Sequence, residues 1–436
     1  MHDEVRHCLK AILPAALQHA ATLPPDEVPF LVWTRKGSGW YGSHELHPVL
    51  PIAGPLSLEE LARPLEQVMS RHHPEHLGLV GTAHAGLRLD AEYLLRNLVY
   101  EVWDRHATLD VSGDVIDSLI SDFESFIDAT QIRIRYLAPI VNLRVEPVVA
   151  EIPLSSFVTI KQLTDADVSE LYGGRADALG HLHRPEQSGF PEYAFVGVFD
   201  EPKRFGFDGV WPSQQFEQVQ AQLRRAVLAL RSYGSGPIGY REVHLRAVGF
   251  CPGLVTTITG TGEYIPLGRY VLSAGGIDSF RAHAQHVAAR LHPALDLAIS
   301  RLSDAEVRTS PRDKLVDAVI GLEAVLLHGG QRQELRYRFA MNYASLVDVP
   351  AERLAKLAVA MGIYNCRSKL VHGGHIADSK LVIVGEQKLT LSQAAETACE
   401  MLREVVKHFL PEGDRPAFCG QQYWEQRLFG LTHPSQ

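Results

Sequence analysis

The spacing of hydrophobic positions divides the chain into helical segments and a strand-like middle. In the last third, apolar residues recur at intervals of three and four, the repeat of an amphipathic helix. They predict helices over residues 279–291, 311–327, 333–347, 350–371 and 390–409. The last four helices are joined mostly by short connections, which is the pattern of a four-helix bundle.

The residues at the ends of these segments are ones that start and stop helices. Thr390 followed by Gln393 has the form of a capping box. Pro350 suits the first turn of a helix. Glycines at 329 and 373 follow the ends of two of the predicted helices, as expected at helix C-termini.

The middle of the chain is rich in Val, Ile, Leu and Tyr, with prolines between the runs, and this pattern predicts strands. The predicted strands cover residues 133–144, 148–160, 193–199, 242–250 and 254–258. One helix is expected among them, over residues 214–232. We therefore interpret this region as mixed α+β.

The first eighty residues are rich in Pro, Gly and His and predict irregular structure with short elements, whereas residues 90–127 have a helical pattern. The whole chain is thus expected to be α+β and predominantly α. Four regions are predicted: a mostly helical or irregular region over 1–130, a strand-rich α+β domain over 131–275, a helical bundle over 276–415 and a tail over 416–436.

Composition narrows the class of protein. The 436 residues suffice for two or three domains, and 46% hydrophobic with 21% charged residues is ordinary for a folded chain. No apolar run approaches the roughly 20 residues of a membrane span, and the N-terminus lacks the pattern of a signal peptide. A cytoplasmic location without membrane attachment is expected.

The cysteines argue against a disulfide framework and against a zinc ribbon, because they are odd in number and never form a CxxC pair. They are Cys8, Cys251, Cys366, Cys399 and Cys419. Histidine pairs are expected by chance among 21 histidines. His283 and His286 share a helical face, but no carboxylate or third histidine follows them at metal-site spacing. His181 and His183 would share a strand face, and His72, His73 and His76 lie in a loop that contains a proline. We expect no metal site and no cofactor.

Two other kinds of catalytic motif are also discounted. The run from Gly249 to Gly253, with Cys251 at its centre, has the form of a nucleophile elbow. An elbow needs a helix directly afterwards, and the next residues predict a strand instead. No phosphate-binding loop of a nucleotide triphosphatase is present in the sequence.

One segment does carry a pattern with chemical meaning. Arg367, Ser368 and His372 lie at the C-terminal end of the third helix of the predicted four-helix unit, followed by two glycines. Here the chain resembles the HEPN superfamily, and specifically its ApeA-like branch, over about residues 302–410. The match is an Arg-x4-His element with a polar residue directly after the Arg. A fainter resemblance, over residues 139–164, is to the strand-rich segment found before ApeA-like domains.

The resemblance implies an endoribonuclease that needs no metal. In that mechanism the 2′-hydroxyl of the RNA attacks the adjacent phosphate and leaves a 2′,3′-cyclic phosphate. Arg and His from both protomers of a homodimer line the catalytic cleft, which makes Arg367 and His372 the implied catalytic residues. Phage defence and toxin–antitoxin behaviour are common settings for the superfamily. Ser368 departs from the Asn, Asp or His common at this position in HEPN ribonucleases, although Ser is usual in the ApeA-like branch.

These residue types suit the reaction in their own right. A histidine such as His372 is the residue type suited to accept the 2′-hydroxyl proton near neutral pH. The guanidinium of Arg367 can hold two oxygens of the pentavalent phosphate at once. Four further side chains are expected to contact the substrate: Ser368, Lys369, Asn365 and Arg338.

The spacing raises a geometric problem. A five-residue step on a regular helix rotates the side chain by about 140°, so Arg367 and His372 would not share a face. Two arrangements solve it. Either the helix loosens before Gly373, or each His works beside the Arg of the partner subunit.

The formal net charge of −9 argues against a dedicated nucleic-acid binder but allows an enzyme with a local basic cleft. The prediction is an RNA-cleaving homodimer whose N-terminal half responds to a trigger ligand or protein. A non-catalytic dimeric HEPN module that binds RNA or acts as a scaffold remains the alternative. A toxin silenced by a partner enzyme's modification is a third possibility.

Overall fold

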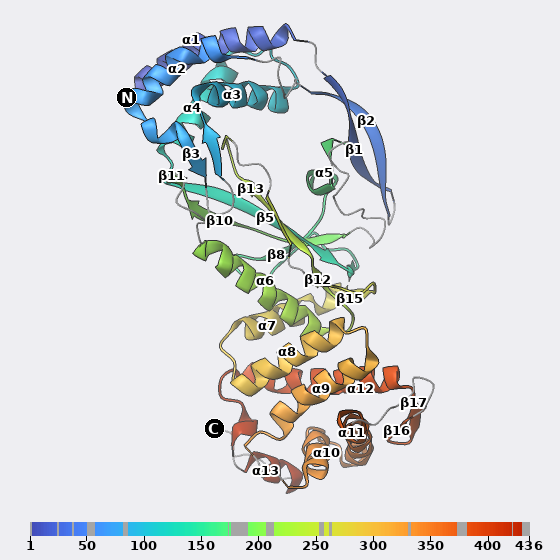
Figure 1. The fold of residues 1–436 in the computed structure, drawn as a ribbon. Helices are drawn as coiled ribbons and strands as arrows, with labels where there is room; N and C mark the ends of the chain where they lie inside the picture. Colours follow the sequence, from blue (N-terminus) through green and yellow to red (C-terminus); the bar gives the residue numbers. More distant parts are fainter. Residues whose placement is uncertain are drawn as a thin grey trace.

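The computed structural model describes most of the chain. It covers residues 2–23, 26–36, 39–49, 57–81, 86–172, 174–175, 191–205, 213–252, 257–260, 264–329, 333–372, 382–420 and 422–429. Figure 1 shows three tiers: N-terminal helices, a twisted sheet and a set of C-terminal helices. The fold is α+β and mainly helical, as predicted. No helix within this part of the chain is both long enough and apolar enough to span a bilayer.

Four helices form the N-terminal tier and share a core of their own. They are α1 (His2–Ala21), α2 (Glu59–His72), α3 (Ala91–His106) and α4 (Gly113–Asp128). The prediction of short, irregular elements in the first eighty residues was wrong, because α1 alone has 20 residues. Its buried stripe of Val5, Leu9, Leu13 and Leu17 has helical spacing. Pro14 within the helix masks that signal in the sequence.

Two small sheets accompany these helices. The first has the order β2-β1-β9 and the second the order β11-β3-β4. Their strands are β1 (Asp26–Lys36), β2 (Gly39–Val49), β9 (Gly174–Arg175), β3 (Gly78–Gly81), β4 (Gly86–Leu89) and β11 (Arg204–Phe205). The hairpin of β1 and β2 was not predicted.

The central sheet has the order β14-β13-β5-β10-β8-β7, with β12 paired to β5. Its strands are β14 (Thr257–Gly260), β13 (Glu242–Ala247), β12 (Gly239–Tyr240), β5 (Gln131–Val141), β10 (Tyr193–Pro202), β8 (Thr159–Gln162) and β7 (Glu151–Pro153). These strands confirm the strand-rich middle, although the predicted strand over 148–160 is two short strands joined by a bend. Strands β6 (Leu143–Glu146) and β15 (Tyr270–Ser273) form a separate parallel pair.

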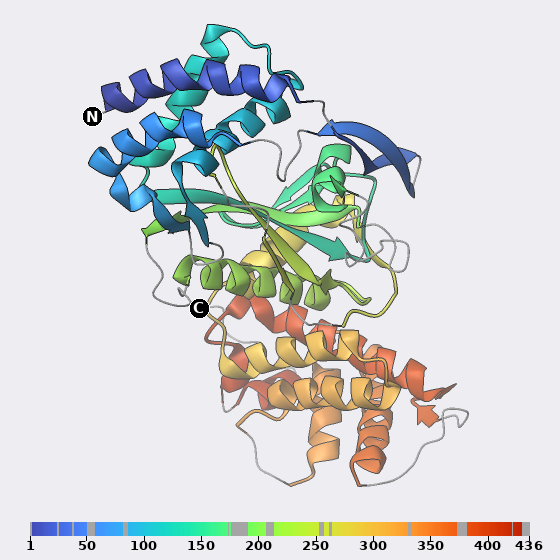
Figure 2. The same ribbon diagram turned by 45° about the horizontal axis from the view of Figure 1, so that its top comes forward.

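Two helices belong to this central tier. Helix α5 (Asp165–Tyr172) follows β8, and α6 (Gln214–Tyr233) packs against β10. The second confirms the helix predicted over 214–232. Figure 2 shows α6 lying between the sheet and the C-terminal helices.

Seven helices and a hairpin form the described C-terminal tier. They are α7 (Ile277–Ala288), α8 (Pro293–Val307), α9 (Pro311–Leu326), α10 (Leu335–Ser345), α11 (Pro350–Val371), β16 (Val382–Val384), β17 (Gln387–Leu389), α12 (Leu391–Phe409) and α13 (Tyr423–Phe429). Helices α9 to α12 confirm the predicted four-helix unit. Helix α8 was not predicted, yet it packs closely on α9 and α12 through Leu295, Ile299 and Leu302.

The segment predicted as a tail is docked on the bundle as far as residue 429. Helix α13 packs against α10. Arg427 donates hydrogen bonds to the carbonyls of Ser345 at 3.1 Å and Leu346 at 3.0 Å. These contacts satisfy carbonyl groups at the C-terminal end of α10, which explains why the segment is ordered.

The sheet and the C-terminal helices share one continuous core, because α6 packs against α7, α8 and α12. A buried ion pair between α12 and α8 lies beside this junction: Arg403 Nη2 is 2.5 Å from Glu306 Oε1. Glu306 also accepts a 3.0 Å hydrogen bond from the backbone of Gly236. The position at 275/276 predicted as a domain boundary therefore lies at the start of a helix but is no break in the packing.

Candidate active site at the end of helix α11

Helix α11 presents its motif residues because its other face is buried. Ala360, Ile363, Cys366 and Leu370 are buried and follow helical spacing. Gly362 and Tyr364 are buried as well, whereas Asn365, Arg367, Ser368 and Lys369 are half-buried or exposed. The helix ends at Val371, where the motif predicted an end. The glycines at 373 and 374 lie outside the described residues.

Arg367 is held by the neighbouring helix. Its Nη2 donates to Glu323 Oε2 on α9 at 3.0 Å, and the Tyr364 hydroxyl hydrogen-bonds to the same carboxylate. Burial raises the pKa of Glu323, whereas Arg367 and Tyr364 oppose that rise. Glu323 therefore holds the Arg367 guanidinium from the side of α9. The Arg367 side chain is 22% exposed, so it remains partly accessible to solvent. Glu323 was not predicted, because nothing in the sequence shows which α9 residue faces α11.

His372 caps the same helix and is exposed. Its backbone N–H donates to the Ser368 carbonyl at 3.1 Å, which is the regular helical bond. The helix therefore does not loosen between Arg367 and His372, and the first of the two explanations for their spacing was wrong. The two side chains leave α11 in different directions.

Two arginines from other helices meet the last turns of α11. Arg312 of α9 donates to the Leu370 carbonyl at 2.9 Å. Arg336 of α10 donates to Asn365 Oδ1 at 3.2 Å. The sequence favoured Arg338 over Arg336 as a substrate contact, but Arg338 is half-buried and Arg336 is exposed. Arg336 thus links α10 to the motif helix through a side-chain hydrogen bond.

Cationic side chains therefore gather at one helix end in a chain whose net charge is −9. We call them the α11 cationic cluster. It consists of Arg312, Arg336, Arg367, Lys369 and His372. A helix C-terminus carries partial negative charge, which favours these cations. Lys369 is exposed and Ser368 is half-buried, so both are accessible beside Arg367.

The structure also brings together ligands that the sequence analysis left apart. Among the described residues, two groups could hold a metal ion: His73 with Glu75 and His76, and His292 with His328 and Cys419. His283 belongs to neither group. It is buried, and its Nε2 lies 2.7 Å from Ser232 Oγ. His181 and His183 lie outside the described residues.

The group of His73, Glu75 and His76 lies against a buried cation. Glu75 Oε1 is 3.1 Å from His76 Nδ1. Lys203 Nζ donates to the Phe126 carbonyl and lies 4.0 Å from the centre of the Phe126 ring. Burial and then Lys203 lower the pKa of His76 to about 4. Burial lowers the pKa of Lys203 itself to about 8.

Cys251 has no features of a nucleophile. Burial raises the pKa of its thiol to about 12, so the reactive thiolate is scarce near neutral pH. The next described element is strand β14. The structure thus agrees with the decision to discount the elbow motif.

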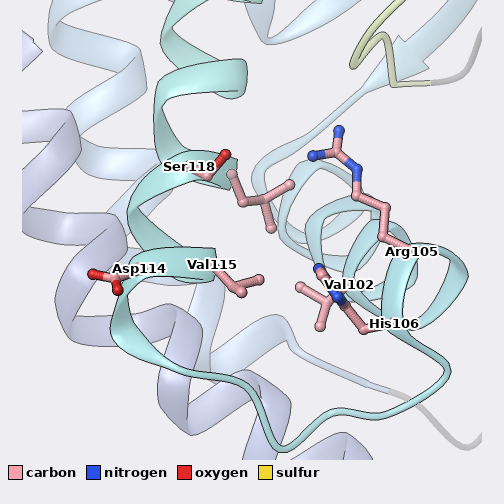
Figure 3. Close-up of a pocket in the computed structure, with 7 residues that line it drawn as sticks. Val102, Arg105, His106, Asp114, Val115 and Ser118 are labelled. Atoms are coloured by element: carbon pink, nitrogen blue, oxygen red, sulfur yellow. The ribbon is translucent and has the colours of Figure 1, made fainter.

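A separate hollow of about 300 Å³ lies between α3 and α4. Figure 3 shows Arg105 and His106 beside it on α3, and Val115 and Ser118 on the facing side of α4. Arg105 forms ion pairs with Glu101 at 2.8 Å and Asp122 at 2.7 Å. The hollow therefore has the size for a small ligand, but its arginine is already neutralised.

Comparisons with known proteins found no matching family model, no matching curated protein and no matching solved structure.

Proposed function

We propose that this protein is a metal-independent endoribonuclease whose active site is formed by Arg367 and His372 in a homodimer. The observation that carries the proposal is the α11 cationic cluster. In it, a partly exposed arginine anchored by Glu323 lies five residues before an exposed histidine on the same helix. The resemblance of this motif to HEPN ribonucleases, and its position in a bundle of four main helices, give the same assignment.

The reaction follows from these side chains. Neutral His372 accepts the proton of the ribose 2′-hydroxyl. The 2′-oxygen forms a bond to phosphorus while the bond from phosphorus to the 5′-oxygen breaks. The leaving 5′-oxygen takes a proton from water, and His372 afterwards returns its proton to the solvent, so the products are a 2′,3′-cyclic phosphate and a 5′-hydroxyl. Arg367 donates to the non-bridging oxygens and stabilises the charge that develops on them.

Dimerisation is part of the proposal because α11 is regular up to its cap. With about 140° between the two side chains, one chain cannot direct Arg367 and His372 at the same phosphate without distortion. A two-fold axis beside the end of α11 would place each His372 next to the other protomer's Arg367. Glu323 acts as a positioning residue for the arginine.

In this proposal the remaining residues of the chain restrain or trigger the nuclease, since a free ribonuclease is toxic to its host. The continuous core between the sheet and the bundle provides a physical connection for such control. Phage defence or a toxin-type stress response is the biological setting that the resemblance implies. The trigger would be a ligand or protein that binds the N-terminal half.

A second function has one observation in its favour. Within a single chain Arg367 is already paired with Glu323, and the protein as a whole is acidic. Both facts suit a non-catalytic dimeric module that binds RNA weakly or acts as a scaffold. The two functions differ in whether a phosphodiester bond is broken.

The test is cleavage of total RNA in EDTA by the wild-type protein, Arg367→Ala and His372→Ala, with analysis of the RNA ends. We expect cyclic-phosphate ends from the wild type alone, and a loss of about a hundredfold or more in each variant. Arg224→Ala on α6 and His7→Ala on α1 are matched controls, because both side chains are exposed and lie outside the cluster. Circular dichroism checks that all variants are folded.

Undiminished cleavage by both motif variants would reject the active-site assignment. Binding of RNA without cleavage by any protein, in the presence of cell extract as a source of the trigger, would favour the scaffold function.

A further inference from the structure

We propose that His292, His328 and Cys419 form a site for zinc or a similar divalent transition metal that fastens the C-terminal segment to the helical bundle. This inference does not depend on the proposed nuclease function. The three ligands come from three separate segments: the N-cap of α8, the residues just after α9, and the short 3-10 helix η6 (Ala417–Cys419).

The geometry is close to that of a bound metal. One ligand atom of each residue lies within 4.8 Å of the other two. The two imidazole rings are 4.9 Å apart at an angle of 88°. Ligands of a tetrahedral zinc ion are roughly 3.5 Å apart, so small rotations about side-chain bonds would complete the site.

The segment carrying Cys419 is held in place without a metal. Phe418 is buried, and its ring centre lies 5.7 Å from that of His292 and 5.5 Å from that of His328. The Glu412 carboxylate accepts a hydrogen bond from the Ala417 backbone at the start of η6. Neighbouring residues therefore hold the Cys419 thiol near the two histidines. Metal binding would then cost little conformational entropy.

The local charges favour a cation. His328 follows the C-terminal end of α9, where the helix dipole is negative. Burial and Glu412 raise the pKa of Cys419, and a bound metal would supply the positive charge that its thiolate needs.

Metal binding would break one existing hydrogen bond of His292. His292 Nδ1 accepts a 3.2 Å hydrogen bond from the Ala294 backbone at the start of α8. A metal on either ring nitrogen of His292 displaces that bond, because Nδ1 then carries a proton or the metal itself. The displaced bond is long and lies at a helix N-terminus, where solvent can satisfy the free N–H.

The ligand types select the metal. Two imidazoles and one thiolate favour zinc and cobalt(II) over magnesium and calcium, which prefer oxygen ligands. A fourth position is left for water. The group of His73, Glu75 and His76 is a weaker choice, since Lys203 already places a positive charge beside His76.

The experiment uses the full-length protein, purified with a reductant and stripped of metal, and titrated with cobalt(II). We expect one cobalt per chain, with the tetrahedral visible bands and the sulfur-to-cobalt charge-transfer band of a thiolate ligand. Cys419→Ser should lose the charge-transfer band and bind at least about tenfold more weakly, and His328→Gln should also bind more weakly. Cys8→Ser is the control, because that half-buried cysteine lies in α1.

Thermal unfolding provides a second measurement. Zinc should raise the melting temperature of the wild type and of Cys8→Ser, but not that of Cys419→Ser, because only a ligand of the folded state stabilises it. An unchanged charge-transfer band in Cys419→Ser would overturn the proposal. So would cobalt binding that survives in Cys419→Ser and disappears in His76→Gln, since the metal would then lie at the other group.

Discussion

At the scale of single residues, several buried or half-buried polar side chains pair with residues that are distant along the chain. Arg367 and Glu323 are 44 positions apart, and Ser232 and His283 are 51 apart. Such pairs matter because a buried polar group without a partner costs free energy. They also make the protein sensitive to changes that add or remove a proton.

His283 should make the protein sensitive to acid. Burial, followed by Lys407 and His286, lowers the pKa of His283 to about 4, from about 6.5 in the unfolded chain. Because the folded-state pKa is the lower one, the stabilisation is present above pH 6.5 and is lost as the pH falls towards 4. Between pH 7 and pH 4.5 we expect His283→Gln to lose roughly 2 kcal/mol less unfolding free energy than the wild type.

The measurement is urea unfolding at a series of pH values. The slope of the unfolding free energy against pH is compared between variants, rather than the stability at a single pH. His7→Gln, an exposed histidine on α1, should follow the wild-type slope. Parallel profiles for His283→Gln and the wild type would contradict the role assigned to His283.

At the scale of elements, the bundle depends on close approaches that only small residues allow. Gly362 of α11 faces the hairpin of β16 and β17. A Cβ atom at this position would lie 2.7 Å from Val384 Cα and 2.9 Å from the Ile383 carbonyl oxygen. The obstructing atoms belong to the backbone, so a rotamer change cannot relieve the clash. Gly362 thus determines how closely the hairpin packs on the helix that carries the motif.

Gly362→Ala should destabilise the protein by about 1–3 kcal/mol, the usual cost of overpacking. This sign is the reverse of the normal effect, since alanine is favoured over glycine within a helix by up to about 1 kcal/mol. Gly113→Ala at the start of α4 is the matched control, because a Cβ there meets nothing within 4 Å. Chemical denaturation measures the stability of both variants. Equal stability of the two would show that the hairpin moves away from the added methyl group without a measurable cost in free energy.

At the scale of the whole molecule, the proposed active site needs two copies of the chain. The regular end of α11 separates Arg367 from His372 on one chain. In a two-fold dimer, each site would combine the arginine of one protomer with the histidine of the other. This arrangement can be tested with two inactive proteins.

A heterodimer of Arg367→Ala and His372→Ala, isolated by co-expression with two different affinity tags, should regain about half of the wild-type cleavage rate. One of its two sites contains both wild-type side chains, and the other contains neither. The control is a doubly tagged dimer of Arg367→Ala alone, which should stay inactive. If the heterodimer is also inactive while the wild type cleaves RNA, the site lies within one chain.

The helices and strands that could be predicted are those with clear local signals. Helix α12 begins with the capping box of Thr390 and Gln393, and both of its hydrogen bonds are present. Helix α1 and helix α8 were missed, although both bury regular stripes. Pro14 and the neighbouring histidines obscured the first. The second begins with His292 and Pro293, a proline that marks a helix start as readily as a loop.

The sequence by itself determined the fold class, the four main helices of the bundle and the position of Arg367 and His372 at a helix end. These depend on periodicity and capping, which involve residues a few positions apart. Only the tertiary structure decided that Glu323 holds Arg367, that Arg336 meets the motif, and that His292, His328 and Cys419 lie together. Those contacts depend on how helices pack against one another, and the spacing of residues within one helix does not specify its neighbour.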